Sequence, residues 1–249
     1  MNRFLSRRQV IQLITIASLG RVPLLRAAQG GGDWQPIFDG KTLTGWKPTE
    51  KSHHSKASGN TTGGNWRVDK GAIVGDQDTP GNGGFLMTEA EYGDCEIVLE
   101  TNNDFGTDSG VFLRCTQDGK GYQCLIDYHD AGTIGGILGE RIWSGRAVRN
   151  YSFGKSPDII TLNENAAHPC PVLPEAWKNF WHVGEWNEVR ARITGDPPTI
   201  ATWVNGVKIM EHTEPRSVHP AKGHVGLQIH GGKKFAGTVR YRNIRVRVL

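Results

Sequence analysis

Polar side chains recur on one side of several alternating segments, and their types are suited to proton transfer and carbohydrate binding. The set combines carboxylates, one arginine, two amides and one histidine, and it contains no lysine. In chain order its members are Glu96, Glu100, Arg114, Gln123, Asp127, Gln228 and His230. A curved sheet would gather such side chains into a trough, whereas an ordinary solvated sheet face is the alternative for the group.

His230 and Asp127 are the candidate acids or bases of this set. His230 precedes Gly231 and Gly232, which allow a loop to approach a ligand closely. An imidazole titrates near neutral pH and can therefore act as a general base. A surface histidine at a turn, and an aspartate that ends a strand, are the plainer alternatives.

Arg114 could stabilise a developing oxyanion, or it could pair with Glu100 across neighbouring strands. Both interpretations place it on the polar face. Glu96 and Glu100 lie four residues apart, so about 13 Å separates their Cα atoms at ~3.3 Å per residue. Retaining glycosidases hold two carboxyl groups about 5–5.5 Å apart. The spacing therefore disfavours a classical endoglucanase.

Four aromatic residues are candidates for stacking against sugar rings, although tryptophan in a β protein more often belongs to the core. They are Tyr122, Trp143, Trp177 and Trp181. Metal-binding patterns are weak: the pair Asp127 and His129 and the pair His53 and His54 stand without an H-E-x-x-H motif. The sequence predicts no metal site from a motif, and a divalent metal ion stays an open cofactor.

The elements that must position these residues are strands, because apolar and polar residues alternate with a period of two. The alternation covers residues 95–100, 111–115, 122–127, 188–193 and 225–230. In each segment one face is apolar, which is typical of a sheet with one face on a core. About ten to twelve strands with few short helical turns predict an all-β, two-sheet antiparallel sandwich, with a closed barrel as the alternative.

Two local features set the register of the later strands. Asn205 and Gly206 join Thr199–Val204 to Val207–Met210, and this dipeptide suits a type I′ hairpin. The apolar phase of residues 239–248 changes from odd to even positions, so a bulge is expected near Asn243.

The N-terminal residues predict export. Residues 1–28 contain five arginines and no Lys, Asp or Glu, and the pair Arg7 and Arg8 precedes a short apolar stretch. That stretch is too short to span a membrane and resembles a twin-arginine leader. We expect an exported protein, periplasmic or extracellular, with the leader cleaved or kept as a tether.

Beyond the leader, residues 29–33 form a Gly-rich linker and residues 34–249 are expected to form one domain. Without the leader, 24 of the 29 basic residues remain against 25 acidic ones, which argues against nucleic-acid binding. Residues 51–65 and 150–183 are expected to be irregular, since the second segment holds four prolines.

The four cysteines lack a C-x-x-C pattern and are expected to be buried free thiols or to include one disulfide, such as Cys124 to Cys170.

Several sequence blocks together resemble the secreted bacterial 3-keto-disaccharide hydrolase family. They are Ile37–Trp46, Trp66–Ile73, Ser109–Arg114, Gly121–Gln123, Gly184–Glu188, Trp203–Gly206, Gly226–Gly231 and Arg242–Arg247. The resemblance covers residues 34–249 in order. It implies a concanavalin-like jelly-roll sandwich and action on 3-keto-glycosides as lyase and hydratase, or as net hydrolase.

The positions that match the family's polar residues are Glu100, Arg114, Asp127, Gln228 and His230. We expect His230 or Asp127 to be the base that removes the C2 proton, Arg114 or a divalent ion to stabilise the enolate, and Glu100 to orient or protonate. Substrate contacts are expected from Gln123, Gln228, Tyr122 and Trp143. The partner is thus a glycoside or oligosaccharide, and a non-catalytic carbohydrate-binding module is the alternative function.

Overall fold

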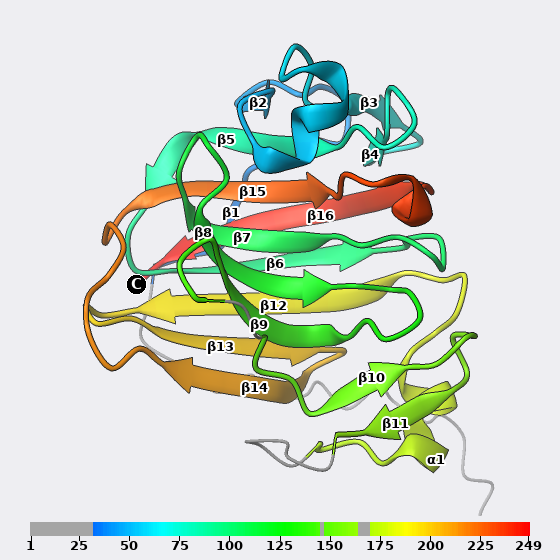
Figure 1. Ribbon diagram of the computed structural model, residues 1–249. Coiled ribbons are helices and arrows are strands. Elements are labelled where there is room, and N and C mark those ends of the chain that lie inside the picture. The colour runs from blue at the N-terminus through cyan, green and yellow to red at the C-terminus, as the bar shows by residue number, and fades with distance from the viewer. Residues whose placement is uncertain (1–31, 145–146, 164–169) are drawn as a thin grey trace, which may run out of the picture. The chain divides into compact units, whose positions relative to one another are not determined.

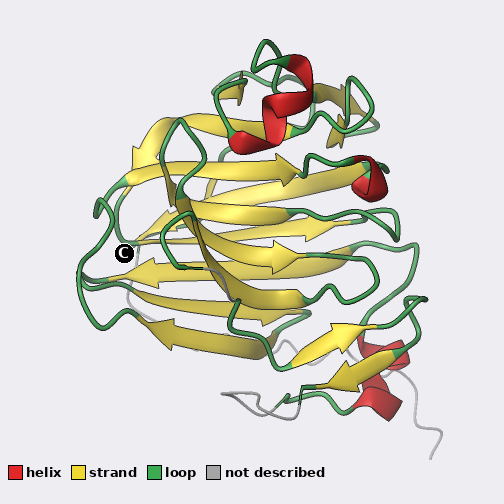
Figure 2. Ribbon diagram, viewed as in Figure 1, coloured by secondary structure: helices red, strands yellow, loops and turns green. Residues whose placement is uncertain are grey.

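The computed structural model describes residues 32–144, 147–163 and 170–249, and strands dominate this part of the chain (Figures 1 and 2). The predicted export signal at 1–28 and most of the predicted linker at 29–33 lie outside the described residues. The domain is a two-sheet antiparallel sandwich, as the alternation predicts, and has the jelly-roll fold that the family resemblance implies.

The larger sheet has eight strands, all paired antiparallel. Its spatial order is β14 (Val207–Thr213), β13 (Thr199–Val204), β12 (Asn187–Thr194), β6 (Cys95–Thr101), β16 (Val239–Val248), β4 (Ala72–Asp76) and β3 (Asn65–Asp69), with β1 (Gln35–Pro36) on β16. The central neighbours are distant in sequence, since β6 lies between β12 and β16.

The second sheet has six strands and carries most of the predicted site residues. Its order is β2 (Trp46–Thr49), β5 (Gly84–Tyr92), β15 (Gly223–Ile229), β7 (Gly110–Cys115), β8 (Gly121–Ile126) and β9 (Ile134–Glu140). Two short 3-10 helices, η1 (His53–Ser58) and η2 (Lys233–Phe235), lie in the loops before β3 and β16. The segment 51–65, expected to be irregular, therefore contains η1.

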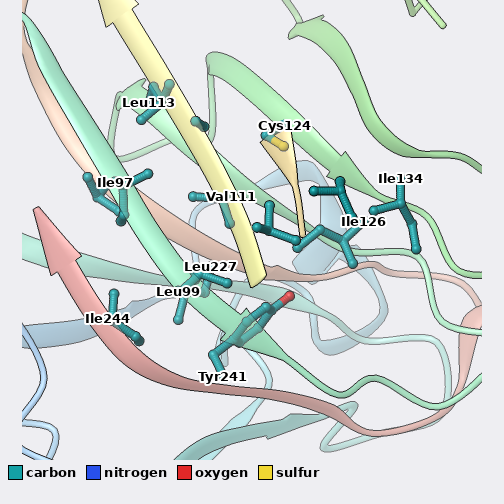
Figure 3. Packing of buried hydrophobic residues seen from close by; sticks show 14 of the residues in the cluster. Ile97, Leu99, Val111, Leu113, Cys124, Ile126, Ile134, Leu227, Tyr241 and Ile244 are labelled. Atoms are coloured by element: carbon teal, nitrogen blue, oxygen red, sulfur yellow. The ribbon is translucent and has the colours of Figure 1, made fainter. Parts of the chain in front are cut away.

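The apolar faces of the two sheets meet in one core. Ile97 and Leu99 of β6 pack with Val111 and Leu113 of β7 and with Leu227 of β15 (Figure 3). Burial of this apolar surface is the main force that holds the sheets together. A second, smaller cluster lies on the outer face of the six-stranded sheet, and it contains Phe85, Met87, Phe112 and Cys115.

Both predicted backbone features are confirmed. Asn205 and Gly206 have φ of 44° and 82°, so both central turn residues are left-handed, as a type I′ hairpin requires. The pairing of β16 with β6 shifts register between Arg242 and Arg245, and Asn243 has φ of 54°. The bulge restores inward positions for Ile244 and Val246, which are both buried.

The segment 150–183, expected to be irregular, contains regular structure. A hairpin of β10 (Tyr151–Phe153) and β11 (Ile160–Leu162) is followed by α1 (Pro174–Phe180), and Pro174 stands in the first turn of the helix. Proline fits there because the first turn has no intrahelical partner for its missing N–H. Tyr151, Phe153 and Trp177 are buried.

All four cysteines are free, so the alternative of a Cys124–Cys170 disulfide is wrong. Burial raises the pKa of the thiol of Cys124 to about 12 and also raises that of Cys170, which makes both poor nucleophiles. No helix within the described ranges is long and apolar enough to cross a membrane.

Candidate active site

Arg114 lies in the interior at one end of β7, and its prediction as a residue of the polar face is wrong. Phe112 pairs with Gly226 of β15, and Cys115 pairs with His224. Leu113 and Arg114 therefore both stand opposite the single residue Val225, which is a β-bulge. This bulge, with φ of 50° at Arg114, shifts the alternation by one position, and Cys115 follows Phe112 on the outer face.

The guanidinium of Arg114 is occupied by structural hydrogen bonds. Its Nη2 donates to Asp94 Oδ1 at 2.7 Å and its Nη1 donates to Gly195 O at 3.0 Å, with the side chain 1 % exposed. The other end of β7 meets His230, whose N–H donates to Asp108 O. Asp108 and Arg114 are six positions apart, or roughly 20 Å along an extended chain. The two residues therefore do not share a site.

Glu100 is also outside the site, because it projects from the outer face of the eight-stranded sheet. It stands opposite Arg242 and Glu188 on the neighbouring strands, and Arg242 Nε donates to its Oε2 at 2.5 Å. The outer faces of the two sheets point in opposite directions. The predicted role of Glu100 as orienter or acid is therefore wrong.

The aromatic substrate contacts predicted for Tyr122 and Trp143 are wrong as well. Tyr122 is fully buried in the core between the sheets. Trp143 follows β9, lies with its ring against Gly139 and donates from Nε1 to Glu214. It lines a separate pocket with His212, whereas Trp177 and Trp181 belong to the core, as their plainer interpretation holds.

Asp127, Gln123, Gln228 and His230 are brought together where β8 and β15 reach the start of β7. Gln123 Nε2 donates to Ser109 O at 3.2 Å and to Gln228 Oε1 at 3.0 Å. Both glutamines are almost fully buried, at 2 % and 1 % exposed. The hydrogen bonds from Gln123 to Gln228 and to the backbone of Ser109 hold the ends of these strands together. Contact of the two glutamines with substrate stays a prediction.

Two carboxylates face each other at this end of the sheet. Asp127 follows β8, and Asp108 comes just before β7. Burial, together with the charge of Asp108, raises the pKa of Asp127 well above its ordinary value. Asp127 Oδ1 is buried and has no hydrogen-bond partner among the described residues.

Two imidazoles turn the same nitrogen toward Asp108. Nε2 of His129 lies 3.5 Å and Nε2 of His230 lies 3.9 Å from Asp108 Oδ2. Nδ1 of His129 donates to Asp130 O at 2.7 Å, and Nδ1 of His230 donates to Gly231 O. A carbonyl oxygen can only accept, so each Nδ1 carries a proton and each Nε2 is left to accept a proton or bind a cation.

A third imidazole, His54 of η1, connects this group to the edge of the sheet. Its ring centroid lies 4.3 Å from that of His230 and 3.8 Å from that of His53, and its Nε2 contacts Gln228 Nε2 at 2.8 Å. His53 Nε2 lies 2.8 Å from Glu140 Oε1 at the end of β9. Burial, with the nearby charges of His230 and His53, holds the pKa of His54 well below its ordinary value, so His54 stays neutral.

The turn after β15 is held by Gln77 and covered by Phe235. Gln77 Nε2 donates to His230 O and to Gly232 O, both at 2.9 Å. The ring of Phe235 meets those of His129 and His230 at centroid distances of 4.9 and 4.7 Å. This ring is a candidate apolar wall for a sugar, since sugars present C–H faces to aromatic rings.

Tyr128 anchors the loop that carries Asp127 and His129. It is 2 % exposed and packs against Phe105, Phe153 and Trp181 with ring centroids 5.1 to 5.4 Å apart. Its N–H donates to Thr107 O, beside Asp108. Phe153 and Trp181, from the segment expected to be irregular, thereby support the loop that carries Asp127 and His129.

Two groups of described residues have the donor atoms for a metal ion. One is His53, His54 and Glu140, and the other is Asp108, Asp127 and His129. In each group the three donor atoms lie within 4.8 Å of one another. Imidazole and carboxylate donors suit first-row divalent metals.

Sequence reasoning missed Asp108 and Phe235, and it set His54 and His129 aside as members of weak metal patterns. All four lie in loops or short 3-10 turns, where alternation gives no orientation. The signal that was available is the recurrence of His and Asp near the strand ends, in the pairs His53–His54 and Asp127–His129.

Comparison with known proteins bears on both sequence and fold. The sequence pattern of the 3-keto-alpha-glucoside-1,2-lyase-like domain matches residues 33–247. No curated protein sequence matches the chain.

Among solved structures, two provisionally assigned glycosyl hydrolases of Parabacteroides distasonis ATCC 8503 are similar in fold. The first aligns over 88% of this chain and 94% of its own, with a TM-score of 0.53 at 18% identity. The second aligns over 87% of this chain and 100% of its own, with a TM-score of 0.52 at 23% identity. β-Agarase B of Zobellia galactanivorans aligns over 91% and 97%, with a TM-score of 0.51 at 11% identity. At such identities the likeness shows the jelly-roll fold alone.

Proposed function

The chain belongs to the 3-keto-alpha-glucoside-1,2-lyase-like family, and on that premise we propose that it cleaves 3-keto-glycosides by elimination across C1 and C2 of the oxidised sugar. Membership in this family places the chain among carbohydrate-active proteins. The observation that carries the finer proposal is the pair of imidazoles, His129 and His230, whose accepting nitrogens meet at one carboxylate.

The chemistry follows from the ketone at C3, which acidifies the hydrogen on C2. A base takes that proton, and the electron pair of the C–H bond moves into the C2–C3 bond while the C3 oxygen becomes an enolate. When the enolate returns to a ketone, the C1–O bond breaks and a C1–C2 double bond forms. The leaving oxygen takes up a proton, so the products are an enone and a free alcohol or sugar. Addition of water to the enone completes net hydrolysis.

His230 is the base in this proposal. Its Nε2 accepts because Nδ1–H is held by Gly231 O, its side chain is 30 % exposed, and Asp108 at 3.9 Å stabilises the imidazolium that forms. Asp127 is the alternative base from the sequence, and it lies deeper, beside Asp108. Because its pKa is raised, its carboxyl holds a proton more readily than an ordinary aspartate and is less available as the base.

The row of rings from His230 through His54 to His53 leads to the pair of His53 and Glu140. This pair is the proposed acid for the leaving oxygen, because His53 and Glu140 are 30 % and 16 % exposed and can exchange protons with solvent. Phe235 forms the apolar wall against the sugar ring.

The test incubates the purified protein with a 3-keto-disaccharide and, separately, with its unoxidised parent disaccharide. We expect release of the reducing-end sugar from the first substrate only, with transient absorbance of the enone. Release from both substrates would indicate ordinary hydrolysis and contradict the proposal. Binding of sugars with release from neither would favour the carbohydrate-binding module.

Export is a further part of the proposal and rests on the sequence of residues 1–28. Replacing the pair by lysines, as Arg7→Lys with Arg8→Lys, is expected to leave the protein in the cytoplasm of its producing cells. Cell fractionation and immunoblotting measure this. Unchanged export of the double variant would show that the paired arginines are not an export signal.

A further inference from the structure

We propose that Asp108, Asp127 and His129 bind a divalent metal ion, with His230 beside it. The binding itself is independent of the proposed function, whereas the role given to the ion below rests on that function. None of the four residues forms part of a recognisable metal motif in the sequence.

The distances suit one ion. The donor atoms of Asp108, Asp127 and His129 all lie within 4.8 Å of one another. Zinc and similar ions bind imidazole nitrogen and carboxylate oxygen at about 2.0–2.2 Å, so the donor atoms of one tetrahedral ion lie roughly 3.3–3.6 Å apart. Nε2 of His129 and Oδ2 of Asp108 already have this spacing, at 3.5 Å.

The hydrogen bonds of the two imidazoles match those of metal ligands. Metal-binding histidines usually donate their other ring N–H to a carbonyl or carboxylate, which fixes the tautomer and aims the free nitrogen. His129 donates from Nδ1 to Asp130 O at 2.7 Å, and His230 donates from Nδ1 to Gly231 O. Both accepting Nε2 atoms are thus directed at the acceptor oxygen Asp108 Oδ2, at 3.5 and 3.9 Å. Nε2 of His129, Nε2 of His230 and Oδ2 of Asp108 are all acceptors. They repel one another unless a cation or a proton lies between them.

The same group contains buried polar atoms without a partner. Asp127 Oδ1 and His129 Nε2 both lack a hydrogen-bond partner among the described residues. Leaving such atoms unsatisfied is unfavourable, and more so for charged groups. A divalent ion placed between them would satisfy both atoms.

The second candidate group is less suited, because its members already have partners. His53 Nε2 lies 2.8 Å from Glu140 Oε1, and His54 Nε2 contacts Gln228 at 2.8 Å. The geometry therefore favours the group of Asp108, Asp127 and His129.

Three protein ligands leave positions on the ion for substrate oxygens, as in catalytic metal sites. The elimination needs an electrophile at the C3 oxygen, and Arg114 is not available for it. A metal ion beside His230 would polarise the ketone next to the base. The mixed imidazole and carboxylate ligands favour Mn²⁺, Fe²⁺, Co²⁺ or Zn²⁺ over Ca²⁺ or Mg²⁺.

The test measures metal binding directly. The full chain is treated with a chelator, dialysed, and titrated with Co²⁺ and Mn²⁺ in a calorimeter, and Co²⁺ is also followed by its visible absorption. We expect one ion per chain and a rise in Tm on binding. Asp127→Asn and His129→Gln should each weaken binding by at least about 100-fold, more than the loss of an outer partner usually causes.

Matched controls are Asp130→Asn, an exposed neighbour in the same loop, and Glu140→Gln in the second group. Asp130→Asn should bind as the original chain does. No stoichiometric binding by the original chain, or binding lost in Glu140→Gln but kept in Asp127→Asn, would overturn the proposal. Circular dichroism of each variant separates loss of a ligand from loss of the fold.

Activity separates this inference from the proposed function. Full-rate cleavage of a 3-keto-disaccharide by metal-free protein would overturn the role of the ion and leave the function intact. Tight metal binding without any cleavage would support the site and contradict the function.

Discussion

Replacing His230 by alanine is expected to lower turnover of a 3-keto-glycoside by about 10²–10⁴-fold, the usual contribution of a positioned general base. The reason lies in its two nitrogens. Nδ1–H donates to Gly231 O, which leaves Nε2 to accept the C2 proton, and Asp108 at 3.9 Å stabilises the resulting charge. Steady-state release of the reducing-end sugar measures the loss.

His224→Ala is the matched control, because His224 lies at the other end of β15 and pairs with Glu91. It should keep turnover within about twofold. Added imidazole should restore part of the activity of His230→Ala, which a purely structural role would not allow. A folded His230→Ala variant that keeps a tenth or more of the turnover would rule out His230 as the base.

The strands and their inward faces could be predicted from the sequence because burial on one side of a strand requires a period of two. The alternation of residues 95–100 and 225–230 places Ile97, Leu99 and Leu227 in the core, where the structure has them (Figure 3). The turn at Asn205 and Gly206 was readable because few residues adopt a positive φ.

The grouping of polar residues could be predicted only in part, because alternation separates inside from outside and says nothing of which sheet a strand joins. Glu100 and His230 both project away from the core, but β6 and β15 belong to different sheets. Gln123 and Gln228 were grouped correctly because β8 and β15 both flank β7. Long-range pairing decides such questions, and it is set by packing across the whole sandwich.

Asp108 was missed, and His54 and His129 were given no role in the site, for a different reason. Their segments are loops and a 3-10 helix, whose side chains are aimed by tertiary contacts. His54 reaches Gln228 because Gly231 allows its backbone to approach: a Cβ at Gly231 would lie 2.5 Å from His54 O. In the sequence such a close approach is visible only as a glycine, which does not show which segment comes near it.

Replacing Asp94 by alanine is expected to destabilise the domain by about 1–3 kcal/mol, because it leaves the buried guanidinium of Arg114 without its charged partner, although the Asp94 side chain is itself 44 % exposed. Arg114 is 1 % exposed, and Asp94 is the acidic group that its guanidinium meets, at 2.7 Å. The carboxylate also accepts from Gly195 N at 3.0 Å, so its loss affects two chain segments. Urea unfolding at pH 7 measures the change, and Glu100→Gln, whose pair with Arg242 is partly exposed, should cost about 1 kcal/mol or less.

A further substitution, at Arg114, separates a structural role of this residue from a catalytic one. Adding Arg114→Met to Asp94→Ala removes the unpaired charge, so the double variant should regain part of the lost stability, as coupling within one ion pair requires. Turnover per folded molecule should stay within about twofold, because Arg114 lies at the far end of β7 from His230. A double variant that regains stability but loses turnover by 100-fold or more would show that Arg114 acts in catalysis. It would contradict our conclusion that the bulge in β7 directs Arg114 away from the active site.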